Sequence, residues 1–180
     1  MAKNSFCLAF SSMATALSVA VLFLTGIFPL GTFALPALAG VFLIGVVAEC
    51  GCRWAWAVYF AVSALSFLTA GDREAVLFFI LLFGYYPILK SVMESKFRRP
   101  ARILLKLLAF NAAAVLEFKL AVWLLGVPKE SFFLFGRYVP GLFLILGNAV
   151  FVVYDYALSL LAVSYWKKVH PVLQKWTRRP

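Results

Sequence analysis

The sequence predicts an all-α fold: a polytopic bundle of about six membrane-spanning helices that forms a single domain over residues 1–180. Hydrophobic residues make up 64% of the chain and mean hydropathy is +0.97, whereas soluble domains are about 45–50% apolar. The apolar residues form long runs separated by short polar turns. Since a spanning helix needs about 20 residues, the 180 residues hold about six helices and leave no room for a soluble catalytic domain.

Polar turns, glycines and prolines mark the ends of the expected helices. The expected ranges are 6–28, 35–48, 54–70, 75–89, 103–127 and 138–166, followed by a basic tail at 167–180. The first apolar run is too long for the core of a signal peptide, so we expect it to be retained as a helix. We expect Asp72 to cap the fourth helix and the sequence Gly84-Tyr85-Tyr86-Pro87 to kink it.

The formal net charge of +10 predicts the orientation of the bundle. In a soluble protein this excess would suggest nucleic acid as a partner, but in a membrane protein Lys and Arg act as topology signals and headgroup contacts. With the N-terminus inside, Arg73, Lys129 and Arg137 fall outside and Lys119 lies within a helix, which leaves 13 of the 17 Lys and Arg residues inside. Residues 90–100 are expected to form a solvated basic loop there. We therefore expect both termini in the cytoplasm, the lipid bilayer as a partner and no nucleic acid.

Polar side chains within the last two expected helices form the candidate substrate-binding site, because ionisable groups in a bilayer need a partner, a water-filled cavity or an interfacial position. The candidates are Asn111, Glu117, Lys119, Asn148 and Asp155. At about 1.5 Å per residue, antiparallel packing is expected to bring Asn111 and Asp155 to similar depth, within about one turn. In one interpretation the candidates line a ligand pocket. In the other they only join helices, with Asp155 bonded to the hydroxyl of Tyr85 or Tyr86.

Small residues recur four apart along the first expected helix. They form two rows, Ser12/Ala16/Ala20 and Ala14/Ser18. Such rows allow another helix to approach closely. Two interpretations stay open: packing inside the bundle, or docking to a separate subunit.

The sequence predicts no enzyme active site, no metal site and no cofactor. Cys7, Cys50 and Cys52 are odd in number, and the single histidine, His170, lies far from them. The chain has no Ser-His-Asp set, no His-Glu-x-x-His motif and no P-loop, so nucleotide hydrolysis by this chain is not expected. A lipid-modifying enzyme would need a catalytic carboxylate at the interface, and Glu94 alone is a poor candidate.

Three local features accompany the six-helix architecture: the small residues of segment 12–20, a second helix that is entered through Pro36, and the stretch from Gly45 to Gly51. With these features the whole chain resembles the substrate-binding S components of energy-coupling factor (ECF) transporters. The resemblance implies a multi-pass protein of the bacterial cytoplasmic membrane that binds a vitamin-like small molecule on its outer side. The sequence from Gly84 to Lys90 also resembles small multi-pass proteins of Gram-positive anaerobes, which implies no function.

The resemblance also implies partner subunits. A transmembrane coupling subunit would contact the first helix, and ATPase subunits would power uptake. The matching docking positions are Ala14, Ala16, Ser18 and Ala20. The leading hypothesis is therefore a substrate-binding subunit of an uptake transporter, in which Lys119 pairs with an anionic group of the ligand. The alternative is a non-catalytic accessory or scaffold membrane protein whose polar residues serve helix packing alone.

Overall fold

The structure is a computed structural model, described for residues 2–28, 31–124, 133–134, 137–138 and 140–177. These residues are helical apart from turns and two short antiparallel strands, so the predicted all-α class is confirmed. The helices are α1 (Ala2–Leu24), α2 (Ala34–Cys50), α3 (Cys52–Thr69), α4 (Arg73–Phe78), the π-helix η2 (Phe79–Phe83), α5 (Tyr86–Lys96), α6 (Arg99–Leu124), α7 (Pro140–Lys168) and α8 (His170–Thr177). The strands are β1 (Phe133–Leu134) and β2 (Arg137–Tyr138).

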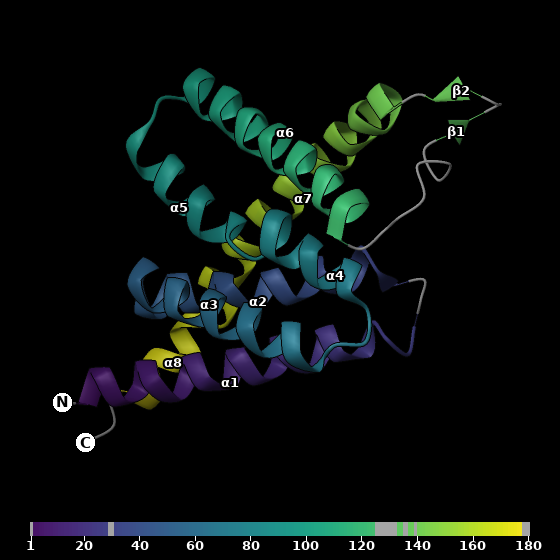
Figure 1. Ribbon diagram of the computed structural model, residues 1–180. Coiled ribbons are helices and arrows are strands. Elements are labelled where there is room, and N and C mark those ends of the chain that lie inside the picture. Colours follow the sequence, from purple (N-terminus) through teal and green to yellow (C-terminus); the bar gives the residue numbers. More distant parts are fainter. Residues whose placement is uncertain (1, 29–30, 125–132, 135–136, 139, 178–180) are drawn as a thin grey trace.

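The helices alternate in direction and lie in two groups (Figure 1). One group is formed by α1, α2 and α3, which make the most extensive contacts of the described chain. The other contains α5, α6 and α7, and α6 and α7 cross each other in Figure 1 rather than running side by side. The side of the molecule on which α1 begins and α7 ends is called the terminal side below.

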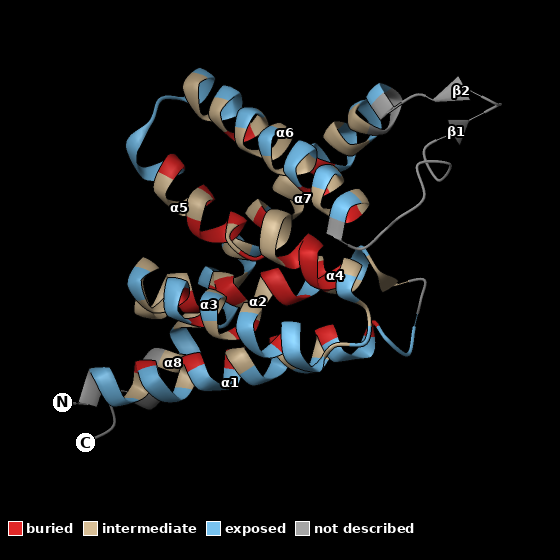
Figure 2. Ribbon diagram, viewed as in Figure 1, coloured by how far each residue is buried: buried red, intermediate tan, exposed pale blue. Residues whose placement is uncertain are grey.

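Buried residues concentrate where the two groups meet (Figure 2). Leu22, Leu43 and Phe79 are fully buried in the larger core cluster, which joins α1 and α2 to η2. A smaller cluster forms around Tyr86 and Phe151 between α5 and α7. The polar groups described below lie beside this smaller cluster.

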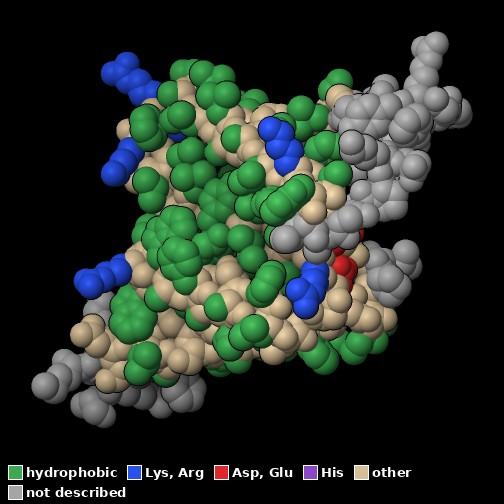
Figure 3. Space-filling view, in the orientation of Figure 1, with side chains coloured by type: hydrophobic (Ala, Val, Ile, Leu, Met, Phe, Trp, Pro, Cys, Tyr) green, Lys and Arg blue, Asp and Glu red, His purple; other side chains and the backbone are tan. Residues whose placement is uncertain are grey.

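Much of the outer surface is apolar. Trp123 and Leu68 are 82% and 80% exposed, and Figure 3 shows hydrophobic side chains across the middle of one face, with Lys and Arg side chains around it. Among the described residues, three helical segments are long and apolar enough to cross a membrane: Asn4–Leu24, Arg73–Lys96 and Leu144–Leu173. A water-soluble monomer rarely exposes apolar patches larger than a few hundred Å², so this surface suits a lipid environment.

The segment 73–96 is where the structure departs most from the expected helices. The side chain of Asp72 accepts a hydrogen bond from the Ala75 N–H at 3.1 Å, which confirms the predicted cap. The predicted kink is present as η2 followed by a break, because Pro87 has no N–H to continue the helical bonding and starts α5 instead.

The expectation of a solvated loop at residues 90–100 is wrong for residues 90–96, which belong to α5, and for residues 99–100, which begin α6. Lys90 and Glu94 are four residues apart and form an ion pair at 3.1 Å, a spacing that supports a helix. The expected tail is also helical in part, as α8. The other helices lie at the expected places with ends displaced by a few residues. The expected end of the fifth helix at 127 and tail residues 178–180 lie outside the described residues.

Candidate functional site

Two lysines and two carboxylates meet where α5, α6 and α7 pack together. This ionic cluster consists of Lys90, Glu94, Lys106 and Asp155. The ammonium group of Lys90 contacts a carboxylate oxygen of Asp155 and lies 3.1 Å from Glu94 Oε1. Lys106 Nζ lies 2.8 Å from Glu94 Oε1 and 3.0 Å from both oxygens of Asp155. Each lysine thus bridges both acids, and the four formal charges cancel.

Hydroxyl groups complete the coordination of the ionic cluster. Tyr86 donates its hydroxyl hydrogen to Asp155 Oδ1 at 2.6 Å, and Lys90 Nζ donates to Ser159 Oγ at 2.8 Å. Lys90 and Lys106 are only 6% and 7% exposed. Buried charges are tolerated only when paired and hydrogen-bonded, and both conditions hold here.

Helical spacing explains how the sequence assembles these groups. Tyr86, Lys90 and Glu94 recur every four residues, so they project from one face of α5. Asp155 and Ser159 have the same spacing on α7. The sequence-based reasoning missed Tyr86-Lys90-Glu94 as a site because it assigned Lys90 to a loop. The four-residue spacing was the signal that could have identified it.

A cavity of about 270 Å³ adjoins the ionic cluster between α2, α5 and α7. Lys90, Ser91 and Glu94 line its polar part, and Leu158 and Trp166 line part of its apolar wall. This volume is slightly below the range of about 300–1,000 Å³ common for ligand pockets. The cavity can therefore hold a small molecule that presents both a polar group and an apolar part.

The cavity lies toward the terminal side, since α2 and α7 line it with their C-terminal halves. The charge count predicts that this side faces the cytoplasm. The resemblance to S components implies a pocket on the opposite side, so the structure and the resemblance differ on this point.

Asn111 and Asn148 form a closed pair between α6 and α7. Each side-chain amide donates to the other's carbonyl oxygen at 2.9 Å and to a backbone carbonyl one turn earlier, that of Leu107 or Leu144, at 2.8 Å. All four amide hydrogens are used. The pair joins the two helices and leaves no donor for a ligand.

Asn111 therefore lies beside Asn148 and not at the level of Asp155, as the sequence-based estimate expected. Asp155 is about two helical turns further along α7, roughly 10 Å away. The estimate counted depth from the helix ends. That count fails because α6 and α7 cross (Figure 1), so equal distances from their ends do not mean equal positions.

The remaining two candidates lie further along α6. Glu117 is buried, with 9% exposure, and no ion pair involves it among the described residues. Lys119 is exposed. Of the five candidates, the structure thus brings only Asp155 to the ionic cluster, pairs Asn111 with Asn148, and leaves Glu117 and Lys119 apart from both.

The two rows of small residues on α1 have different surroundings. Ala14 and Ser18 are buried, and Ser18 Oγ donates to the Ala39 carbonyl of α2 at 3.2 Å. Ala16 and Ala20 are exposed. One row therefore packs inside the bundle, while the other remains on the surface.

Comparisons of this chain with models of protein families, with curated proteins and with solved structures give no match. The class of protein is therefore defined by the structure alone: a helical bundle with an apolar outer surface and a buried ionic cluster beside a cavity. The resemblance to S components of ECF transporters stays a prediction.

Proposed function

We propose that this protein spans the bacterial cytoplasmic membrane six times and is the substrate-binding subunit of an uptake transporter that partner ATPases power. The ionic cluster beside the 270 Å³ cavity carries the proposal. Ionisable residues within membrane helices are costly, and they usually mark binding sites or ion pathways. A cluster of four such residues that adjoins a cavity of ligand size supports a binding role.

The proposed topology has six spans: α1, α2, α3, the α4–α5 segment, α6 and α7. Their alternating directions support it, as does the position of the start of α1 and the end of α7 on one side of the molecule (Figure 1). The bias of Lys and Arg toward that side favours cytoplasmic termini.

The ligand that fits these groups is a small amphiphilic anion, and a vitamin-like carboxylate is one example. Glu94 is the most accessible acid of the ionic cluster, with a side chain that is 40% exposed, and it lines the cavity. An anionic group of the ligand can replace Glu94 as the partner of Lys90 and Lys106. The exchange keeps both lysines paired, so it avoids the cost of an isolated buried charge.

The exposed row on α1 is the proposed contact for the coupling subunit. Ala16 and Ala20 are small and exposed, so a helix of a partner can approach the backbone there. Ala14 and Ser18 pack inside the bundle, where Ser18 is hydrogen-bonded to α2, so they stabilise the fold of this chain.

A second candidate function is an accessory or scaffold membrane protein. The observation in its favour is that the ionic cluster and the Asn111–Asn148 pair satisfy their own hydrogen bonds. On this view the polar groups hold α5, α6 and α7 together, and the cavity has no ligand.

Native mass spectrometry of the full chain, gently extracted from its own host membrane, tests the proposal. We expect co-purifying ATPase and transmembrane subunits, or a bound small molecule. A bare protein, or one with lipid alone, under conditions that preserve known transporters would overturn the proposal and favour the accessory function.

Leucine substitutions test the docking row. Ala16→Leu and Ala20→Leu should each release the partner subunits without a change in melting temperature, because both positions are exposed. Ala64→Leu, at an exposed position of α3, is the matched control and should retain them. A complex that survives both α1 substitutions contradicts this interface.

A further inference from the structure

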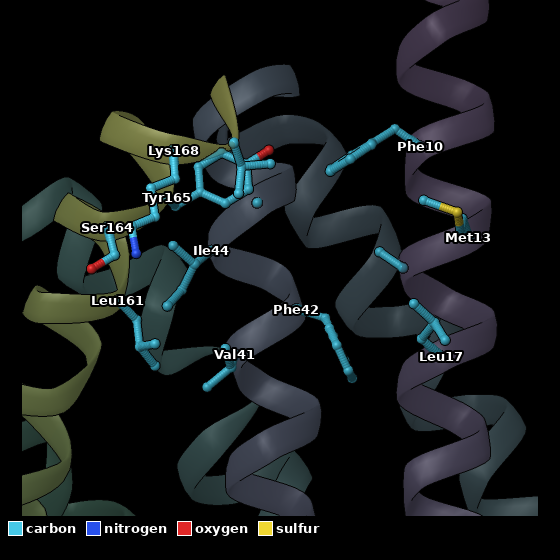
Figure 4. A pocket seen from close by; sticks show the side chains of 13 residues that line it. Phe10, Met13, Leu17, Val41, Phe42, Ile44, Leu161, Ser164, Tyr165 and Lys168 are labelled. Carbon is cyan, nitrogen blue, oxygen red and sulfur yellow. The ribbon is translucent and has the colours of Figure 1, made fainter. Parts of the chain in front are cut away.

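A second hollow, separate from the ionic cluster, lies between α1, α2 and α7 on the outside of the bundle. It is an open groove of about 340 Å³. Figure 4 shows Met13 and Leu17 of α1 on one side, Leu161 of α7 on the other, and Val41 of α2 between them. These side chains make most of the groove apolar.

The groove is mostly apolar, and the polar side chains that line it lie at one end. Ser164, Tyr165 and Lys168 line the end toward the terminal side, where α7 finishes, and Leu17 and Leu161 line the other end (Figure 4). From Leu161 to Lys168 the groove extends roughly 10 Å along α7. A phospholipid in the leaflet of the terminal side has the same order, with its headgroup at the surface and its acyl chains toward the membrane centre.

Gly45 forms part of the floor where the apolar and polar parts meet. A Cβ atom at this position would lie 3.3 Å from both Phe10 Cζ and Tyr165 Cε2. That contact is tight, so even a methyl group would have to displace one of the two rings. The glycine therefore leaves room for the rings of Phe10 and Tyr165 at this part of the groove.

Lys168 places a positive charge at the polar end of the groove. Lys168 is exposed and forms no ion pair with any side chain that the structure describes. The nearby carboxylate of Glu49 accepts a hydrogen bond from the Tyr165 hydroxyl at 3.1 Å and lies 2.8 Å from His170 Nδ1. Glu49 is thus held by other partners, and Lys168 is left to attract an anion.

We propose that this groove binds one phospholipid with an anionic headgroup. An acyl chain lies along Met13, Leu17 and Leu161, and the phosphate lies at Lys168. At membrane depth no water is present to fill an apolar groove, so an acyl chain is its natural occupant. The unpaired lysine at the polar end selects an anionic headgroup, and basic residues near the membrane surface favour such lipids. The site needs a membrane location for the protein but not a transport function.

Competition between two lipids tests this proposal. The full chain is delipidated and reconstituted in nanodiscs that contain equal amounts of phosphatidylglycerol and phosphatidylcholine with identical acyl chains. Native mass spectrometry then counts the lipids that stay bound after release from the disc. We expect one retained lipid per protein, with phosphatidylglycerol in excess.

Two lysine variants locate the headgroup. Lys168→Gln should lower the excess of phosphatidylglycerol about fivefold, the size expected for one basic residue at an anionic surface. Lys167→Gln is the matched control, since Lys167 is exposed on the same turn but does not line the groove. An equal loss in both variants would mean diffuse attraction to the basic end of α7 and would overturn the site.

Two tryptophan variants locate the acyl chain. Leu17→Trp fills the groove from its rim and should abolish lipid retention, while Leu8→Trp, at an exposed position of α1 outside the groove, should not. Melting temperatures of all four variants should match that of the wild type, because each changed side chain is exposed. Equal retention of both lipids, no retained lipid, or a lipid-free dimer of this chain would each contradict the proposal.

Discussion

Lys90 is a charged side chain in the interior of the protein, and its environment explains how that is possible. It contacts the carboxylates of Glu94 and Asp155, the hydroxyl of Ser159 and the Asp155 backbone carbonyl. Lys106 repeats this arrangement with the same two acids. Asp155 is therefore the residue on which both lysines depend.

Asp155→Asn should destabilise the protein by about 3 kcal/mol, because it leaves two buried lysines with the single carboxylate of Glu94. Thermal unfolding in detergent measures the effect. Asp72→Asn is the matched control and should change stability little, since Asn caps a helix about as well as Asp. Equal melting temperatures for Asp155→Asn and wild type would show that the ionic cluster does not stabilise the fold.

Single residues also show where sequence reasoning reached its limit. A bond from the Tyr86 hydroxyl to Asp155 was one of the two interpretations of Asp155, and the structure contains it. Lys90 and Lys106 were counted only as topology signals, and the four-residue spacing of Lys90 and Glu94 indicates just one of their ion pairs. Their role depends on Asp155, which lies 65 and 49 residues away, respectively.

At the scale of elements, the asparagine pair fixes how α6 sits against α7. Asn111→Ala and Asn148→Ala should each cost about 1 kcal/mol of unfolding free energy, typical of polar contacts between membrane helices. The double variant should cost little more than either single one, because each removes the same contact. Denaturant unfolding of the three variants measures the coupling. Fully additive losses would mean that the two amides act independently.

The inner and outer rows of small residues on α1 should respond differently to a larger side chain. Ala14→Leu should destabilise the isolated protein by about 1–3 kcal/mol, since Ala14 is buried against its neighbours and the added atoms overpack the core. Ala16→Leu should leave its melting temperature unchanged. The same loss in both variants would contradict the assignment of the inner and outer rows.

Elements differ in how much of them the sequence reveals. Long apolar runs predicted α1, α2, α3, α6 and α7 at their places, because each is bounded by glycine, proline or charge. The segment 73–96 was harder. Pro87 was expected to kink the last turns of one helix, whereas in the structure it lies in the first turn of a new helix, α5. Whether a proline closes or opens a helix here depends on the tertiary contacts of α5, which a local pattern does not contain.

For the whole molecule, the proposed topology predicts which loops face the cell exterior. Thr69→Cys, at the exposed end of α3, should react with a membrane-impermeant thiol reagent in intact cells. Ser95→Cys, exposed near the end of α5, should react only after permeabilisation. Wild-type protein, with its three native cysteines, is the control. Labelling of Ser95→Cys in intact cells would contradict cytoplasmic termini.

The number of apolar runs predicts that successive helices alternate in direction. It also predicts that the first helix begins on the side of the molecule where the last helix ends. The depth of a side chain on one helix relative to a side chain on another does not follow from the number of apolar runs. The sequence placed Asn111 and Asp155 at similar depth by assuming parallel axes, and α6 and α7 cross instead (Figure 1). Crossing angles arise from side-chain packing along the whole interface, which requires three-dimensional contacts.

The lysines of the ionic cluster are far from Asp155 in sequence, so the ribosome makes them much earlier. Lys90 is made 65 residues before Asp155, which at about 5–20 residues per second is a delay of roughly 3–13 s. Lys106 emerges within this interval, so the nascent α5 and α6 carry two lysines and the single carboxylate of Glu94. The last charge of the cluster arrives only with α7. The ribosome therefore completes the first three members, which carry one net positive charge, well before Asp155 balances that charge, so the cluster is complete only after α7 is made.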